Sequence, residues 1–268
     1  MKLVLMGTND FVVPIFEGLR AAGHDIIAVY TAAPAVQGRK RILTPSPVHA
    51  WADAHGIPVC HRARDFNHKP DFTVVVSYGE MLRDNVLSAA PCINIHPSSL
   101  PQYRGPSPIK TAIYNGDTAS AVCLMAVTPE CDAGDVFMRR PFDIGENDTN
   151  TDIEAKVSQI GRDMLMDYLK APGDFPAVPQ TGTPTFTRKF TGADEIIDWT
   201  RASRDIHNQV RALGGGRTKI NGVDVKILET RMRGGELDIR RVQPAGKKPM
   251  DWASFVNGQH GADIRMGV

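Results

Sequence analysis

The feature that most constrains the fold is a strand–helix–strand pattern at the N-terminus. Residues 2–6 form a short apolar run that ends at Gly7, and residues 11–22 follow with helical periodicity. A second apolar run, residues 25–31, has the length and β-branched content of a strand. Two strands joined by a helix normally lie parallel in one sheet, so we expect an α/β protein with a mainly parallel sheet.

The rest of the first 170 residues continues this pattern and predicts a Rossmann-like fold. Dinucleotide binding at the first turn is nevertheless disfavoured, because Met6–Phe11 supplies only the first glycine of GxGxxG. Phe11 would also obstruct a pyrophosphate. Further strands are expected at 72–77, 92–96, 120–127 and 136–144, and helices at 47–55, 105–116 and 150–170.

A stretch rich in proline and glycine, residues 171–187, predicts a linker between two domains. We expect a catalytic domain at 1–185, a linker at about 171–192, and a small β-rich domain at 193–268. The last of these should contain a helix near 203–213, a hairpin that turns at Asn221-Gly222, and a strand at 236–242.

Composition limits the possible partners. The net charge of +1 argues against a generally basic nucleic-acid binder, and no DNA partner is expected. Residues 201–268 hold 13 Lys and Arg against 7 Asp and Glu, which fits either an anionic partner for the tail or scattered surface arginines. No apolar run could span a bilayer and no leader pattern opens the chain, so we expect a cytoplasmic protein.

The four cysteines show no metal-ligand spacing, so no metal is expected, and buried reduced thiols are the default interpretation. A catalytic thiol at Cys131, beside Asp132, is an alternative.

The strongest chemical signal is an alternating strand at 92–96 that Pro97 ends. Asn94 and His96 share one face of this strand at its C-terminal end, which is where open α/β sheets bind ligands. A polar turn after the next strand contains Asp132. An amide, an imidazole and a carboxylate at one sheet edge favour acyl-group transfer.

In that chemistry the Asn94 amide would donate to the developing oxyanion, His96 would donate or shuttle a proton, and Asp132 would orient the imidazole. No serine or cysteine lies in a nucleophile elbow, so direct attack by an amine substrate is favoured. The alternative remains open at this point, because a strand-end histidine is often purely structural.

Residues 32–46 form an expected loop with three consecutive cations, Arg39, Lys40 and Arg41, next to Gly38. Phosphate contact and a merely solvated charge run are both consistent with this composition.

Two motifs resemble the signatures of folate-dependent formyltransferases: residues 94–109, which read NIHPSSLPQYRGPSPI, and residues 131–136, which read CDAGDV. The resemblance implies that Asn94, His96 and Asp132 form the active site and that 10-formyltetrahydrofolate is the donor. It also implies that the residues matching the family's folate-binding stretches contact the donor, namely Ser98, Ser99, Leu100, Pro101, Tyr78, Gly79, Glu80, Met81 and Leu82.

Four further stretches resemble the methionyl-tRNA formyltransferase family in particular: residues 6–11, 38–48, 197–213 and 243–250. This resemblance implies a cytoplasmic, monomeric enzyme of translation initiation that formylates methionyl-initiator tRNA. Arg39, Lys40 and Arg41 would then contact the acceptor stem.

The chain also departs from the family. Ser99, Asn9 and Cys131 replace a leucine, a proline and a leucine, and the C-terminal segment is too short for a five-stranded oligonucleotide-binding barrel. A reduced barrel is therefore expected. The alternatives are an N-formyltransferase for an amino-sugar nucleotide or another small amine, and a non-catalytic homologue that binds folate or RNA.

Overall fold

The computed structural model describes residues 1–38, 41–259 and 263–267. The chain divides into two compact units, and the division does not follow a single cut. Unit 1 comprises residues 1–106, 121–142 and 154–186. Unit 2 combines the C-terminal residues from 187 onward with 107–120 and 143–153, two segments that lie within the range expected for the catalytic domain.

Unit 1 is built on a seven-stranded sheet. Its strands are β1 (Lys2–Gly7), β2 (Asp25–Tyr30), β5 (Val59–Cys60), β6 (Phe72–Val76), β7 (Cys92–His96), β8 (Ala119–Ala126) and β9 (Val136–Asp143). They lie in the order β5-β2-β1-β6-β7-β8-β9. Pairing is parallel from β5 to β7, and β8 then runs antiparallel to β7. The expected mainly parallel, Rossmann-like sheet is confirmed.

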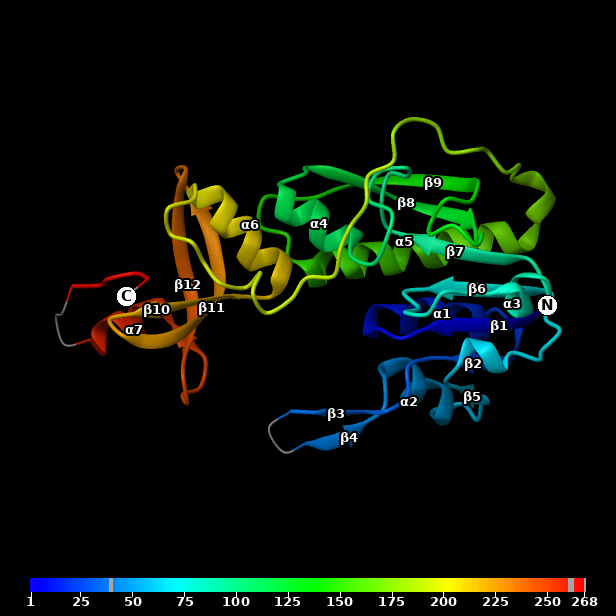
Figure 1. Cartoon of the computed structure of the whole chain (residues 1–268), viewed down its shortest axis with the longest axis horizontal. Coiled ribbons are helices and arrows are strands. Elements are labelled where there is room, and N and C mark those ends of the chain that lie inside the picture. The colour runs from blue at the N-terminus through cyan, green and yellow to red at the C-terminus, as the bar shows by residue number, and fades with distance from the viewer. Residues whose placement is uncertain (39–40, 260–262, 268) are drawn as a thin grey trace. The chain divides into compact units, whose positions relative to one another are not determined.

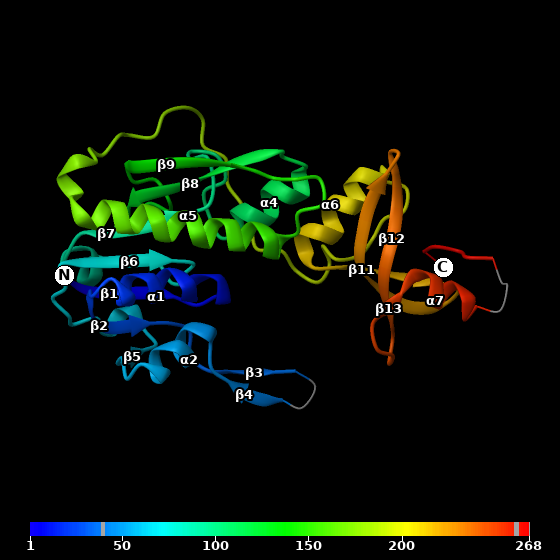
Figure 2. The ribbon, with the colours of Figure 1, turned by 180° about the vertical axis from the view of Figure 1, so that it is seen from behind.

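Helices α1 (Val13–Ala21) and α5 (Asn150–Lys170) lie on one face of the sheet (Figures 1 and 2). Gly161 lets α5 approach closely, because a Cβ there would lie 3.1 Å from Ile95 of β7. The apolar side of the strand at 92–96 is thereby buried. Helix α2 (Pro47–Ala54) lies beside β2 and β5, at the β5 end of the sheet.

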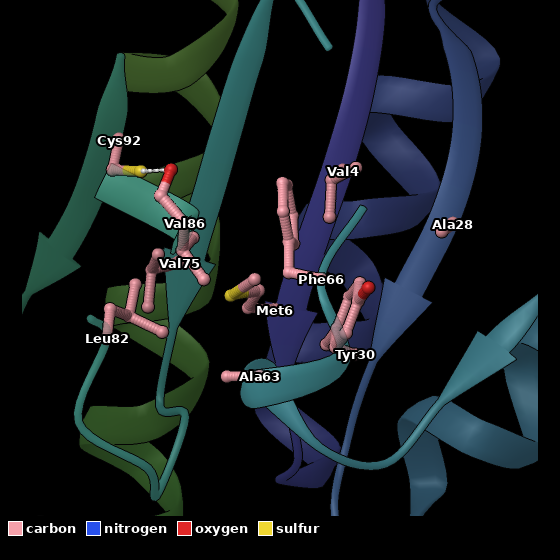
Figure 3. Packing of buried hydrophobic residues seen from close by; sticks show 10 residues of the cluster. All are labelled: Val4, Met6, Ala28, Tyr30, Ala63, Phe66, Val75, Leu82, Val86 and Cys92. Carbon is pink, nitrogen blue, oxygen red and sulfur yellow. Dashed lines mark hydrogen bonds between the residues drawn. The ribbon is translucent and has the colours of Figure 1, made fainter. Parts of the chain in front are cut away.

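The opposite face is covered by the 3-10 turn Ala63–Asp65, the residues that follow it, and the short helix α3 (Asp84–Leu87). Figure 3 shows how Val4, Met6 and Val75 of the central strands pack against this layer. Tyr30 is fully buried there, and its ring packs at a tilt of 32° against Phe66, with the ring centroids 5.5 Å apart. Strands covered on both faces explain the continuous apolar runs in the sequence.

Residues 32–46 differ from the expected loop. They contain a two-stranded hairpin, β3 (Ala35–Gln37) paired with β4 (Ile42–Thr44), that joins no other sheet. A buried 2.7 Å hydrogen bond between the Thr31 and Ser46 hydroxyls closes its base. Arg41 is exposed and has a left-handed φ of 49°, whereas Arg39 and Lys40 lie outside the described residues.

The segment expected as a linker is docked along unit 1 up to residue 186. Val178 exchanges backbone hydrogen bonds with Val136 at the start of β9. The carbonyl of Thr185 accepts the Arg104 N–H at 2.9 Å. Composition correctly indicated irregular structure here, but these long-range contacts between backbones leave no compositional trace.

Unit 2 contains a four-stranded antiparallel sheet packed against α6 (Ser203–Leu213) and α7 (Trp252–Asn257). Apolar residues of this layer, among them Ile206, Val210, Ile227 and Val242, form its core. The expected hairpin turn at Asn221 is present. The strands are β10 (Gly216–Ile220), β11 (Val223–Arg233), β12 (Glu236–Pro244) and β13 (Met250–Asp251).

Ion pairs offset much of the positive charge of this sheet. Lys219 lies 3.4 Å from Asp224, and Arg240 lies 3.2 Å from Asp238. Arg217 and Lys226 both approach Glu195 at 3.9 Å. Asp224 and Asp238 are among the seven acidic residues already counted in 201–268, so only Glu195, which lies before that range, lowers the local positive charge further. In the described ranges, no helix has the length and apolar character needed to cross a membrane.

Stability of unit 2 should depend on pH through His207 of α6. Its Nε2–H donates to the Glu146 carbonyl at 2.9 Å, while Nδ1 lies 2.8 Å from the Thr230 hydroxyl. Burial lowers the pKa of His207 below its ordinary value of 6.5. A lowered folded-state pKa means that the unfolded chain binds the proton more tightly. Stability is therefore retained above pH 6.5 and lost as the pH falls below it.

The free energy of unfolding, measured by urea titration from pH 8 to pH 5, should accordingly decline more in the wild type than in His207→Gln. Parallel curves for the two proteins would contradict this role of His207.

Candidate active site

Strand β7 brings Asn94 and His96 to the C-terminal edge of the sheet, as the alternation predicts. His96 is 4% exposed. Its Nε2 lies 2.9 Å from the Tyr103 carbonyl, which can only accept, so Nε2 carries the proton in the neutral ring. Nδ1 is then the nitrogen that can gain or lose a proton.

Asp132 lies in the turn between β8 and β9, and Gly134 allows that turn to form. A Cβ at Gly134 would lie 2.0 Å from the Ala126 carbonyl oxygen, so any other residue would displace the turn from β8. Asp132 itself has a left-handed φ of 49°. Such a backbone costs on the order of 1–3 kcal/mol and persists where surrounding contacts hold it.

The three side chains converge as the sequence suggested. Asp132 Oδ1 lies 3.6 Å from His96 Nδ1 and 3.4 Å from Asn94 Nδ2. The other oxygen, Oδ2, accepts the Gly105 N–H at 2.8 Å. This backbone donor leaves Oδ1 directed at the imidazole and the amide. A carboxylate in this position stabilises a proton received at Nδ1 and restrains the Asn94 side chain.

Cys131 does not have the surroundings of a catalytic thiol. It is an exposed free cysteine with Sγ 3.4 Å from Asp132 Oδ2. Although the residue as a whole is exposed, partial desolvation of the sulfur, together with the adjacent Asp132 carboxylate, raises the pKa of Cys131 to about 11. The group is therefore a neutral thiol near pH 7, which is a poor nucleophile.

The residues that match the family's folate stretch differ in exposure. Ser98 and Leu100 are fully buried. Ser98 donates to the Gln102 carbonyl, and Leu100 packs against Cys123, Met125 and Val136. Ser99 and Pro101 are half-buried. Side chains of the first pair shape this turn from inside, while the second pair remains accessible to a ligand.

The loop after β6, residues 78–82, borders a cavity of about 640 Å3. Glu80 accepts the Ala63 N–H at 3.0 Å and the Tyr78 hydroxyl at 3.3 Å. Burial and the Glu80 carboxylate raise the pKa of Tyr78, which keeps it a hydrogen-bond donor. Gly79 is exposed, Met81 is 61% exposed, and Leu82 is buried in the core. The cavity is lined by Arg62, Ala63, Arg64, Glu80, Met81, Arg83 and Asn85.

Two backbone groups of the site were not foreseen from the sequence, the Tyr103 carbonyl and the Gly105 N–H. Tyr103 has a left-handed φ of 59°, and this conformation places its carbonyl on His96. Arg104 and Gly105 belong to the 94–109 motif, whose resemblance leaves the role of Arg104 open. Within the described residues, no group of His, Cys, Asp and Glu side chains is arranged to hold a metal ion.

Comparison with known proteins shows the family of the chain. The formyl transferase family model matches residues 1–169, and the model of the formyl transferase C-terminal domain matches residues 189–236. The chain thus belongs to the formyl transferases.

Relatives from the curated proteins narrow the assignment. Methionyl-tRNA formyltransferase of Roseobacter denitrificans is 35% identical, with 96% of each chain covered. That of Symbiobacterium thermophilum is 34% identical and covers 96% of this chain and 92% of its own length. Within the formyl transferases, the chain belongs to the methionyl-tRNA formyltransferase family.

Solved structures share the fold at lower identity. The sugar 3N-formyl transferase WlaRD, crystallised with dTDP and 5-N-formyl-THF, superposes with a TM-score of 0.70 at 18% identity, covering 92% of this chain and 99% of its own. Methionyl-tRNA formyltransferase from Clostridium thermocellum gives a TM-score of 0.65 at 15% identity, covering 91% and 98%.

Removing the imidazole should abolish most turnover. We expect His96→Ala to lower kcat by about 10²- to 10⁴-fold, the range typical of a lost general acid–base. Folate affinity, measured by isothermal titration, should change little, because the His96 side chain is only 4% exposed and the residues that match the family's folate-binding stretches are unchanged in this variant. Wild-type kcat in this variant would exclude His96 from the chemistry.

Proposed function

We propose that the protein transfers the formyl group of 10-formyltetrahydrofolate to the free amino group of methionyl-initiator tRNA. The observation that carries the proposal is the convergence of Asn94, His96 and Asp132 at one sheet edge. Family membership over almost the whole chain supports it. The same proposal places the enzyme in the cytoplasm, as a monomer that acts in translation initiation.

Asn94, His96 and Asp132 have different roles, because an amide donates a hydrogen bond, an imidazole accepts a proton and a carboxylate stabilises positive charge. The co-substrate supplies a formyl carbonyl that the acceptor amine attacks. Asn94 donates through its amide N–H to the oxygen on which negative charge develops. His96 receives the amine proton at Nδ1, because Nε2–H is engaged by the Tyr103 carbonyl. Asp132, at 3.6 Å from Nδ1, stabilises the resulting imidazolium. The imidazolium then returns this proton to N10 of the co-substrate as the bond between N10 and the formyl carbon breaks, so that tetrahydrofolate leaves and the formyl group stays on the acceptor amine.

The cavity beside the 78–82 loop suits a folate co-substrate. Folates carry a pterin ring at one end and glutamate carboxylates at the other. Arg62, Arg64 and Arg83 line the cavity and can pair with those carboxylates, while Met81 offers an exposed apolar surface. We propose that Tyr78, Gly79, Glu80, Met81 and Leu82, with the Ser98–Pro101 turn, contact the folate.

We further propose that Arg39, Lys40 and Arg41 contact phosphates of the tRNA acceptor stem. The hairpin that presents this sequence has exposed strands, and Ile42 and Leu43 are 59% and 65% exposed. In the sequence the three cations lie between the two strands of this exposed hairpin, and arginine and lysine side chains are the usual partners of nucleic-acid phosphates. A small amine would have no use for such an element, which disfavours the amino-sugar alternative.

The acceptor can be identified directly. Wild-type protein and 10-formyltetrahydrofolate are incubated with charged initiator methionyl-tRNA, uncharged tRNA, or a panel of amino-sugar nucleotides. Labelled formyl groups should appear on the charged tRNA alone. Transfer only to a sugar amine would overturn the proposed acceptor, and folate binding without any transfer would identify a non-catalytic homologue.

Removing two loop cations should weaken tRNA binding without affecting the chemistry. We expect Arg39→Ala with Arg41→Ala to raise the KM for tRNA several-fold and to reduce the slope of log KM against log salt by about 2. Arg140→Ala is the control for the loss of a cation elsewhere in the protein. Arg140 lies in β9, outside residues 32–46, and its guanidinium pairs with Asp167 at 2.6 Å. An unchanged salt slope in the double variant would exclude phosphate contact by these residues.

A further inference from the structure

Gln180 lies in the segment that the sequence marks only as a linker, yet its side chain is built into the active site. Both neighbours, Pro179 and Thr181, are exposed, whereas Gln180 is half-buried. Its amide Nε2 donates to the carbonyls of Asp132 and Gly134, each at 2.8 Å. These two bonds bracket the turn that carries the catalytic carboxylate.

The other end of the same amide is held by Arg104. Gln180 Oε1 accepts from Arg104 Nη2 at 2.9 Å and from Nε at 3.2 Å. Arg104 is 8% exposed, and its Nη1 contacts Glu130 at 3.1 Å, at the start of the same turn. A buried guanidinium thus fixes which way the amide faces, with its N–H groups toward the turn.

We propose that Gln180 is a positioning residue for Asp132, and that Arg104 sets its orientation. The strained backbone of Asp132 makes this support necessary, because a residue with φ of 49° relaxes unless its carbonyl is held. Rotation of that backbone would move Oδ1 away from His96 Nδ1 and Asn94 Nδ2. Gln180 therefore acts through Asp132.

This inference rests on the proposed formyl transfer for its kinetic test, and it assigns a role to Arg104 that the sequence left open. The simpler possibility is that Gln180 merely fastens the linker to unit 1. The two roles separate in Gln180→Glu, because a carboxylate retains and strengthens the contact with Arg104 but cannot donate to the two carbonyls.

The kinetic experiment compares the full-length wild type with Gln180→Glu, Gln180→Met and the control Val178→Ala. Val178 has a 57% exposed side chain and holds the linker only through its backbone. We expect Gln180→Glu and Gln180→Met to lower kcat at least tenfold with KM values changed less than threefold, while Val178→Ala matches the wild type. A kcat within twofold of wild type for Gln180→Glu would overturn the proposal.

A double-variant cycle tests whether the effect passes through Asp132. In an Asp132→Asn background, measured under single-turnover conditions, adding Gln180→Glu should cost less than twofold. Independent losses that multiply would show that Gln180 supports something other than Asp132.

A measurement that does not depend on formyl transfer tests the role of Gln180 separately from the proposed function. Hydrogen–deuterium exchange over residues 128–136 should accelerate in Gln180→Glu and stay at the wild-type level in Val178→Ala. If the wild type formylates no acceptor, the proposed function fails but the exchange result still decides the role of Gln180. Unchanged exchange in Gln180→Glu would overturn that role.

Discussion

The site depends on a single hydrogen bond from backbone to side chain, the one that Asp132 Oδ2 accepts from Gly105. Because this oxygen is engaged by the 103–105 turn, Oδ1 is left facing His96 and Asn94. The same turn also presents the Tyr103 carbonyl that engages His96 Nε2. One short stretch of backbone thus orients both members of the carboxylate–imidazole pair from opposite sides.

Strain is concentrated where this orientation is set. Tyr103 and Asp132 both have positive φ, at 59° and 49°, and they belong to the two turns that meet at the imidazole. Non-glycine residues adopt this conformation rarely, and active sites are among the places where structures retain it. Rigid strands deliver the side chains to the sheet edge, and strained turns then determine their final direction.

Much of this architecture could be predicted from the sequence, since short-range patterns encode it. The apolar run of β6 and the alternation of β7 indicate directly which residues are buried. The turn after β8 needs a glycine at position 134 for steric reasons, and this glycine is part of the 131–136 motif. The hairpin within residues 32–46 was missed because Ile42 and Leu43 are exposed and follow no burial pattern. The roles of Tyr103 and Gly105 were missed because backbone groups carry no residue signature.

The small size of the C-terminal domain could be predicted from its length, but the ion pairs within it could not. Counting charges along the chain gave the tail a cationic excess, and that count already subtracts Asp224 and Asp238. In the folded sheet, Lys219 and Arg240 pair with these two carboxylates, while Arg217 and Lys226 share Glu195, which lies before residue 201. Ion pairing is a property of the folded chain, so a linear count cannot show which cations already have a carboxylate beside them.

The docked linker changes where this protein can be divided. The family model for the catalytic domain ends at residue 169, near the end of α5, whereas the sequence predicts the end of this domain at residue 185. A module excised there would retain Asn94, His96 and Asp132 but would lose the strand-like segment that pairs with Val136 and supports Arg104. Domain exchange among such enzymes should therefore preserve function only when the crossover lies beyond residue 186. The candidate active site and residues 171–186 then come from the same parent protein.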